Sequence, residues 1–406
     1  MSNYLRKWLG ISFFNLLIVA SLGVILRYKI AFYLPFVDQK HLLHGHSHFA
    51  FAGWITQALM VLLVHYLNTK NIEKITQKYN WLLYANCITA YGMLIGFIYQ
   101  GYGLFSILFS TLSIFVSYFF AIMYWRDLNK LTITNTTHLW FKASLLFSVI
   151  SSIGTFALVY MMANKIMLQH WQLGSIYFYL HFQYNGWFMF ACIGLIVSKF
   201  ERLIATAKQM KTTFILFCSA CIPAYFLSAL WLPFPMIIYY VVIAAVVAQL
   251  VGWVILMQVF LKNKLYTEQA FYKPGKILLI LSAIAFTIKL ILQSGSVHPA
   301  LSQLSYGFRP IVIGYLHLVL LAITSVFIIG YIVACKLITI NRRLLVGIFI
   351  FVGGVIINEL LLMIQGVQAL SYNSVPYINI LLLVTAIILF LGICSICISQ
   401  FKNFYE

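Results

Sequence analysis

Twelve long apolar runs constrain this chain more than any other feature. Of its 406 residues, 63% are hydrophobic and only 8% are charged, and each run has about 20 residues, enough to cross the hydrocarbon core of a bilayer as a helix. The sequence therefore predicts an all-α, polytopic membrane protein with twelve transmembrane helices in a single membrane domain over residues 1–406. The runs lie at about 7–28, 44–67, 80–100, 103–125, 139–163, 172–198, 211–231, 235–261, 275–293, 310–334, 344–368 and 377–400.

The basic residues predict how these helices are oriented. The net charge is +19, but the Lys and Arg residues form no single aromatic-rich patch, which argues against a nucleic-acid partner and leaves the lipid bilayer as the expected one. Most of them follow even-numbered runs, and by the positive-inside rule those segments and both termini are cytoplasmic. The opposite side carries few basic residues, chiefly Arg27, Lys29, Lys40, Lys165 and Arg309.

A short pattern near the start of an apolar run occurs twice. It reads His-Phe-Ala-Phe-Ala-Gly-Trp at 48–54 and His-Phe-Gln-Tyr-Asn-Gly-Trp at 181–187. An ionisable residue inside a membrane is by default a functional-site candidate. Gly53 and Gly186 would let a flat ring or another backbone approach closely. The alternative is that these glycines, with Trp54 and Trp187, serve helix packing alone.

Histidines recur at a similar predicted depth, near the outer side, in the second, sixth and tenth runs. Two histidines on facing helices can hold a haem iron between them. His44 and His48 share a helix face, whereas His46 points nearly the opposite way, so the cluster can address two partners. The candidate metal ligands are His44, His46, His48, His181 and His317, of which His44, His48 and His317 are the candidate haem ligands. A structural histidine bonded to a neighbouring carbonyl or hydroxyl is the alternative for each.

Three other polar or reactive groups lie within apolar runs. Glu359 is the one carboxylate well inside an apolar run, and it is a candidate proton-relay group, a histidine partner, or a neutral acid bonded to Asn358 and Gln365. Lys289 is expected to extend its amine outward to the interface. The Cys-Ser-Ile-Cys sequence at 394–397 is interpreted as a pair of small core residues rather than a metal or redox site.

The chain resembles subunit I of the haem-copper oxidase superfamily. His44-Gly-His-Ser-His-Phe-Ala-Phe resembles its second-helix motif, and the segment Arg309 to Phe327 resembles its tenth helix, so the resemblance implies axial haem ligation by His44, or a near neighbour, and His317. His181 resembles the copper ligand of the sixth helix, in a pattern similar to the C-family oxidases. The length and the His-x-His cluster are also similar to NnrS, a membrane protein that contains haem and copper and is related to nitric oxide stress.

Two departures from the oxidase pattern set the expected function. The seventh helix, Lys211 to Leu232, has no histidine pair to complete a copper site, and Tyr315 stands where the high-spin haem ligand would be. The resemblance implies a protein of the bacterial cytoplasmic membrane with non-covalent, b-type haem, doubtful copper, and an electron-donor subunit or cytochrome as partner. It would act in electron transfer or in oxygen or nitric oxide chemistry, and whether it turns over as an oxidoreductase is left open.

Two alternatives remain. One is a secondary transporter, which predicts inverted repeats, broken helices and a midplane site. The other is a copper-handling membrane protein that uses His41, His44, His46 and His48. Both alternatives predict a colourless protein.

Overall fold

The chain folds into long helices, seen in a computed structural model that describes residues 3–70, 72, 74–131, 135–201, 203–232, 234–298, 301, 309–371, 373 and 375–405. These residues contain no β-strand. Within this described part of the chain, eleven helices are long and apolar enough to cross a membrane, and one bent pair would make a twelfth. The prediction of an all-α, multi-pass membrane protein is confirmed, whereas the haem-copper oxidase arrangement stays a prediction.

The observed helices match the predicted runs to within a few residues. The second, sixth and tenth runs are each interrupted by a π-helical segment, and the seventh is bent. In chain order the elements are α1 (Asn3–Ala31), α2 (Gln39–Phe49), η1 (Ala50–Thr56), α3 (Gln57–Asn68), α4 (Ile75–Gln100), α5 (Leu104–Asn129), α6 (Thr136–Ala163), α7 (Gln169–His181), η2 (Phe182–Phe188), α8 (Met189–Val197), η3 (Ser198–Phe200), η4 (Ile204–Thr206), α9 (Ala207–Cys221), η5 (Pro223–Ala229), α10 (Met236–Lys262), α11 (Lys264–Ala270), α12 (Lys273–Gly295), α14 (Arg309–His317), η6 (Leu318–Ser325), α15 (Val326–Ala334), α16 (Arg342–Leu370) and α17 (Ile378–Tyr405).

The chain divides into two compact units. Unit 1 comprises Met1–Phe120, Tyr272–Leu281 and Ser325–Glu406, and unit 2 comprises Ala121–Phe271 and Ser282–Thr324. The candidate ligands His44, His46 and His48 belong to unit 1, and His181 and His317 belong to unit 2. The expectation of one membrane domain stays a prediction.

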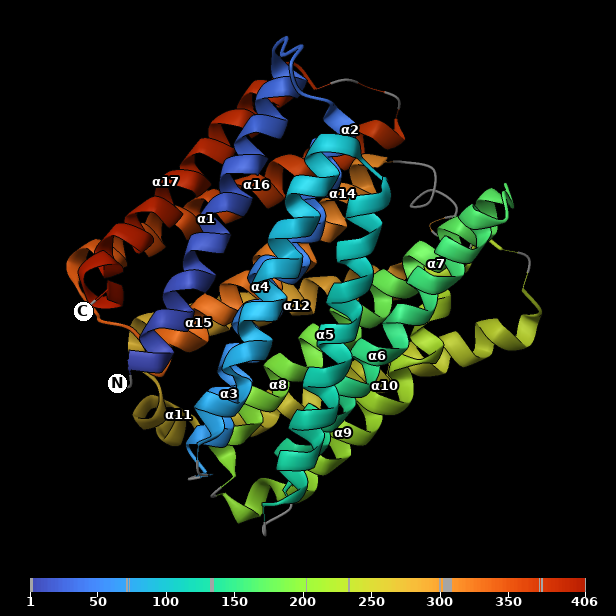
Figure 1. Ribbon diagram of the computed structural model, residues 1–406. Coiled ribbons are helices and arrows are strands. Elements are labelled where there is room, and N and C mark those ends of the chain that lie inside the picture. Colours follow the sequence, from blue (N-terminus) through green and yellow to red (C-terminus); the bar gives the residue numbers. More distant parts are fainter. Residues whose placement is uncertain are drawn as a thin grey trace. The chain divides into compact units, whose positions relative to one another are not determined.

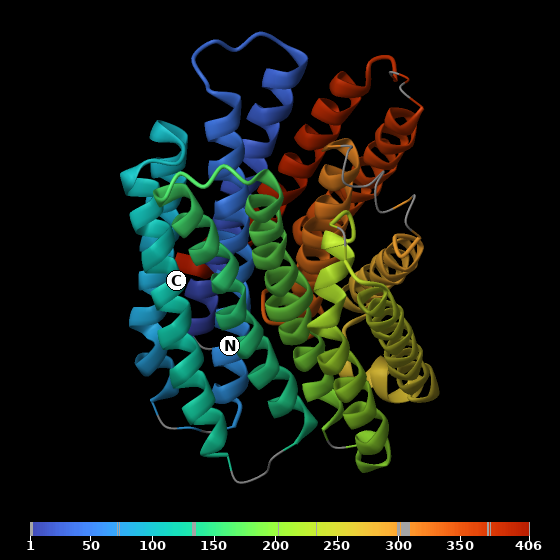
Figure 2. The same ribbon diagram turned by 90° about the vertical axis from the view of Figure 1, so that its right-hand side faces the viewer.

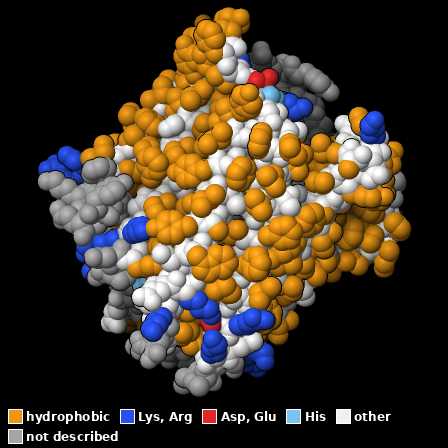
Figure 3. Space-filling model, viewed as in Figure 1, with side chains coloured by type: hydrophobic (Ala, Val, Ile, Leu, Met, Phe, Trp, Pro, Cys, Tyr) orange, Lys and Arg blue, Asp and Glu red, His pale blue; other side chains and the backbone are white. Residues whose placement is uncertain are grey.

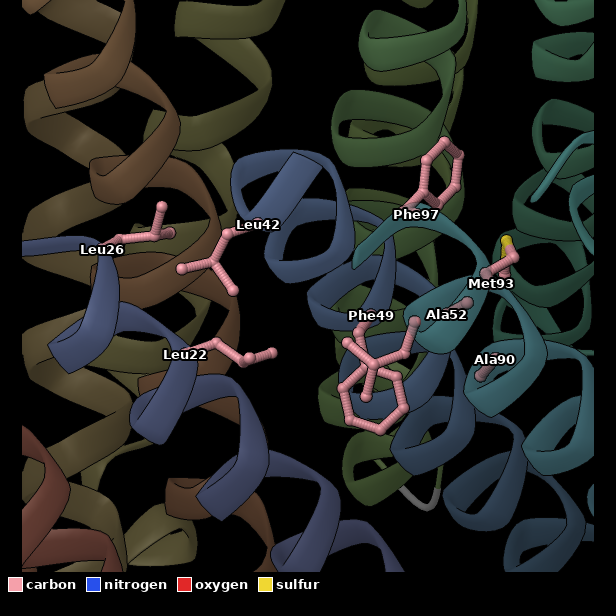
Figure 4. Close-up of a cluster of buried hydrophobic side chains, with 9 residues drawn as sticks. Leu22, Leu26, Leu42, Phe49, Ala52, Ala90, Met93 and Phe97 are labelled. Atoms are coloured by element: carbon pink, nitrogen blue, oxygen red, sulfur yellow. The ribbon is translucent and has the colours of Figure 1, made fainter. Parts of the chain in front are cut away.

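In unit 1, α1, α2 and α4 lie side by side (Figures 1 and 2). Figure 4 shows the apolar cluster between them, in which Leu22 and Leu26 of α1 lie near Leu42 of α2. Phe49 is fully buried in the same cluster. Aromatic and aliphatic side chains therefore fix the rotation of the histidine-bearing helix against both neighbours.

In unit 2, α6 packs against α7, η2 and α8, and α9 packs against α10. The fully buried Trp140 of α6 contacts Phe190 of α8 and Phe217 of α9, with ring centroids 5.0 and 6.0 Å away. These large rings hold three helices of the unit together.

Side chains and a glycine set several helix ends. Asp38 begins α2 by accepting a hydrogen bond from the backbone N–H of His41 (2.8 Å), and Asn341 begins α16 by accepting one from Leu344 (2.8 Å). Such caps satisfy donors that have no partner within the helix. Gly101 ends α4 with φ +61°, where a Cβ would also lie 2.6 Å from His41 Nε2.

Large hydrophobic side chains remain exposed along the long helices, for example Ile95 of α4 and Phe349 of α16. In Figure 3 hydrophobic side chains cover much of the visible surface. A water-soluble protein rarely exposes apolar patches of this extent, so this surface is suited to contact with lipid.

Candidate functional site

Three π-helical segments follow the histidines that the sequence singled out. η1 begins at Ala50, two residues after His48; η2 begins at Phe182, immediately after His181; and η6 begins at Leu318, immediately after His317. A π-helical turn is rare and frequently marks a functional site. The same backbone feature thus begins one or two residues after a histidine on three spans that are four helices apart in sequence.

Side-chain amides from two neighbouring helices donate hydrogen bonds to backbone oxygens in the widened turn of η1. The amide of Asn15 in α1 donates to the backbone oxygen of Gly53 (2.6 Å), and the amide of Asn86 in α4 donates to that of Ala52 (3.0 Å). A side chain that bonds a carbonyl inside the ladder is a recognised cause of local helix distortion. Buried amides on both neighbouring helices therefore stabilise η1.

In the other two π-helical segments a side chain of a neighbouring helix also donates to a backbone oxygen. In η2 the thiol of Cys221 in α9 donates weakly to the backbone oxygen of Asn185 (3.9 Å). In η6 the hydroxyl of Ser282 in α12 donates to the backbone oxygen of Ile323 (2.8 Å). In each case a neighbouring helix supplies the donor.

The repeated glycines of η1 and η2 admit phenylalanine rings. A Cβ on Gly53 would lie 2.6 Å from the ring of Phe49, and a Cβ on Gly186 would lie 2.5 Å from Cβ of Phe147. These glycines therefore give room to phenylalanine side chains, as the packing alternative expects, and the approach of a flat ring stays a prediction. Trp54 Nε1 donates to Ser325 Oγ (2.8 Å), so this indole has a hydrogen-bonding role in unit 1.

His44 and His48 lie together in an aromatic pocket of unit 1. The ring of His48 stacks on Phe97 of α4 with centroids 4.2 Å apart, and the ring of His44 meets the edge of Tyr102 with centroids 4.7 Å apart. His44 Nε2 is buried and has no hydrogen-bond partner. A buried polar atom left without a partner costs about 1–3 kcal/mol, so a ligand that bonded this nitrogen would remove that cost.

His46 faces a different neighbour. A Cβ placed on Gly23 of α1 would lie 3.6 Å from Cε1 of His46, whereas His44 and His48 contact Phe97 of α4. This agrees with the opposite directions that the i, i+2 spacing predicts.

Both ring nitrogens of His181 are engaged in unit 2. Nε2 donates to the backbone oxygen of Cys221 (2.8 Å), which can only accept, so Nδ1 accepts from the amide of Asn185 (3.1 Å). The ring is almost completely buried. Ligation of a metal by His181 would require the Asn185 amide to release Nδ1, and the assignment of His181 as a ligand stays a prediction.

A bend in the seventh span frees the carbonyl that His181 uses. α9 and η5 meet at 43° at Pro223, where proline removes a backbone donor. The N–H of Tyr225 bonds to Ile222 (3.2 Å) instead of reaching Cys221, its partner in an unbroken α-helix. The Cys221 oxygen is therefore available to His181.

His317 has the hydrogen bond expected of a metal-ligating histidine. Its Nδ1 donates to the backbone oxygen of Ile313 (2.8 Å), four residues earlier in α14. This bond fixes the tautomer with the lone pair on Nε2, the arrangement that metal-bound histidines commonly show. Tyr315 packs against Tyr184 of η2 with ring centroids 6.1 Å apart.

The structure corrects the expectation for Lys289. The side chain does not extend outward, because it is only 1% exposed and its amine donates to Gln293 one turn along α12. Sequence reasoning missed this role, although Lys289 and Gln293 share a helix face. Glu359 is half-buried in α16 and accepts a hydrogen bond from Asn358 (3.1 Å), which is one of the predicted contacts; its role as a proton relay stays a prediction.

Within the described residues, no three His, Cys, Asp or Glu side chains converge on a point that could hold a metal ion. His44 and His48 are brought together, whereas His46 faces elsewhere and His181 is held by Asn185 and Cys221.

The fold and these sites define the chain as a multi-pass integral membrane protein with buried or half-buried histidines beside π-helical turns. No protein-family model matches the sequence, and no curated protein does.

Proposed function

We propose that this protein is a haem-binding membrane protein of the haem-copper oxidase-like superfamily. The observation that carries the proposal is the recurrence of one device, histidine followed by a π-helical turn, on the second, sixth and tenth spans. Three equivalent elements spaced by four helices are what the pseudo-threefold arrangement of that superfamily requires. The resemblance to the oxidase helices rests on side-chain identity, whereas the repeated π-helical turn is a feature of the backbone. The two observations are therefore separate.

The candidate haem ligands are His44 of unit 1 and His317 of unit 2. His44 fits this role because its Nε2 is buried without a partner, and His317 fits because its Nδ1 bond to Ile313 leaves Nε2 as the basic nitrogen. Phe97 and Tyr102 present aromatic rings beside His44, as a flat apolar group would need. His48 is the second candidate on the same helix face, and haem would supply a one-electron redox couple when bound.

The proposed activity is electron transfer, or binding of oxygen or nitric oxide, rather than oxygen reduction by a complete haem-copper centre. Cys221 and Asn185 occupy both nitrogens of His181, and the seventh span offers no histidine. The proposal places the protein in the bacterial cytoplasmic membrane with both termini inside, and it includes an electron-donor subunit or cytochrome as partner.

A secondary transporter is the second candidate, favoured by the broken span at Pro223. Discontinuous helices line the substrate sites of many transporters. However, the three π-helical segments lie on even-numbered spans, which cross a membrane in the same direction, whereas an inverted repeat would alternate direction. We therefore prefer the haem-binding function.

Spectroscopy of single-histidine variants tests this proposal. The dithionite-reduced spectrum of the purified protein should show the sharp visible bands of a six-coordinate, low-spin haem. His44→Ala and His317→Ala should each abolish these bands or convert them to a high-spin form. His65→Ala, in the same run as His44 but near its other end, is the matched control and should leave them unchanged. Wild-type bands in both the His44 and His317 variants would remove these residues from the site.

A further inference from the structure

Unit 2 contains a buried lysine that faces no carboxylate. Lys289 is 1% exposed, and the only hydrogen bond described for its amine goes to Gln293 Oε1. The described acidic residues of the unit lie elsewhere: Asp127 pairs with Lys130 (3.0 Å), Glu268 lies 4.0 Å from Lys264 and is exposed, and Glu201 follows the sixth span.

Polar side chains of two helices hold this amine. Gln293 of α12 accepts from Lys289 and donates through Nε2 to Gln249 Oε1 of α10 (2.8 Å), and His181 and Cys221 belong to the same unit. These side chains are buried. The Cys221 thiol donates to the Asn185 oxygen, and it is therefore a neutral group rather than a thiolate partner for the lysine.

An uncompensated ammonium in a low-dielectric interior is strongly unfavourable. Buried ionisable groups in membranes are normally paired or mark the path of an ion. The surrounding amides and imidazole are neutral, so no group described in unit 2 supplies the opposite charge. A charged amine at this position therefore calls for a bound anion.

We propose that Lys289, together with Gln293 and Gln249, forms a binding site for a small monovalent anion. One cation calls for one negative charge, and the amine has two further N–H donors beyond the bond to Gln293. The amine is almost completely buried and the Phe286 ring lies 5.5 Å from it, which restricts the ligand to a halide or to a small planar oxyanion or carboxylate. The site does not depend on haem binding.

The test compares thermal unfolding of the purified protein in sodium salts of equal ionic strength. Chloride, nitrate, formate and acetate are the probes, and gluconate is the reference because it is too large for the site. We expect at least one small anion to raise the apparent Tm of the wild-type protein by several degrees in a concentration-dependent way, since a ligand bound only to the folded state stabilises it. The identity of the best anion distinguishes a halide site from an oxyanion or carboxylate site.

Variants assign the effect to this cluster. Lys289→Met should eliminate the anion-dependent shift, and Gln293→Leu should weaken apparent anion affinity by about tenfold through loss of a buried polar contact. Lys273→Met, at the exposed start of the same helix, and Cys221→Ala should both retain the shift. Equilibrium dialysis with the radiolabelled form of the best anion should give saturable binding to the wild type and not to Lys289→Met.

Two results would overturn the proposal. One is a wild-type protein whose Tm is the same in all five salts, because the amine would then be buried as a neutral group. The other is an anion-dependent shift of equal size in Lys289→Met, because the anion would then bind elsewhere. If Lys289→Met does not fold, the comparison of Gln293→Leu with wild type decides in the same way.

Discussion

Asn15 is the residue on which the π-helical turn of η1 depends most directly. Its side chain is fully buried in α1. Its amide donates to the Gly53 oxygen (2.6 Å), and its Oδ1 accepts from the hydroxyl of Tyr91 in α4 (2.7 Å). Asn15→Leu keeps a similar volume and removes both hydrogen bonds, so the effect comes from lost polar contacts rather than from a cavity.

The expected loss of stability is about 1–3 kcal/mol. Side-chain hydrogen bonds in membrane proteins contribute about 0.6 kcal/mol on average and up to about 1.7 kcal/mol, and two are lost here. The Gly53 oxygen would also lose its external donor, which favours return of η1 to ordinary α-helical bonding. An α-helical turn holds one residue fewer than the widened turn. The return to α-helical bonding would therefore rotate His48 by about 100° about the helix axis relative to α3.

Equilibrium unfolding in mixed detergent with SDS measures the stability change, and the spectrum of the proposed haem reports the rotation. Ser12→Ala is the matched control: Ser12 is equally buried in α1, but its hydroxyl bonds only to Trp8 within the same helix (2.8 Å), so a change below about 0.5 kcal/mol is expected. An Asn15→Leu protein with wild-type stability and an unchanged spectrum would refute the claim that this amide holds η1.

Three further predictions follow from single contacts. Pro223→Ala should straighten the seventh span, so that the Tyr225 N–H bonds to the Cys221 oxygen and His181 loses its acceptor. We expect faster hydrogen exchange at η2 in this variant. An unchanged exchange pattern would show that the bend does not support His181. The backbone N–H of His41 donates to the Asp38 carboxylate and lowers the pKa of that carboxyl group. The contribution of this cap to the stability of α2 should therefore be complete above the unfolded pKa of about 3.9. It should be lost as the pH falls through the lower pKa of the folded state. Exchange at the start of α2, measured relative to Asp38→Asn at each pH, should converge with that of the variant in acid, and a constant difference would contradict this. Copper, measured by elemental analysis after mild chelation, should be substoichiometric, and oxygen uptake with a reduced quinol or cytochrome should be slow; one tightly held copper per chain with rapid uptake would contradict the proposal of an incomplete centre.

The helical architecture could be predicted from sequence because hydrophobicity over about 20 residues determines where a chain crosses a bilayer. The positions of the spans followed directly, and the bend of the seventh span coincides with Pro223. The direction of His46 relative to His44 and His48 also followed, since it depends only on helical periodicity.

The π-helical turns could not be predicted from hydrophobicity, because they depend on donors from other helices. Asn15 and Asn86 look like isolated polar residues in apolar runs, and their partners are backbone oxygens in η1. The site around Lys289 was missed for a similar reason: its position near the end of a run suggested an outward-pointing amine, whereas Gln249 of α10 anchors the Gln293 side chain that holds it inside. A polar residue one helical turn from a lysine within an apolar run is the feature that would have indicated it.

Haem content is the measurement that tests the proposed function most directly. A pyridine haemochrome assay on protein purified after expression with ample haem should give a b-type spectrum at about one haem per chain, because two axial histidine nitrogens, the role proposed for His44 and His317, give a low-spin haem. A value below about one-tenth per chain under the same conditions would contradict haem binding as the reason for these intramembrane histidines and would favour the transporter.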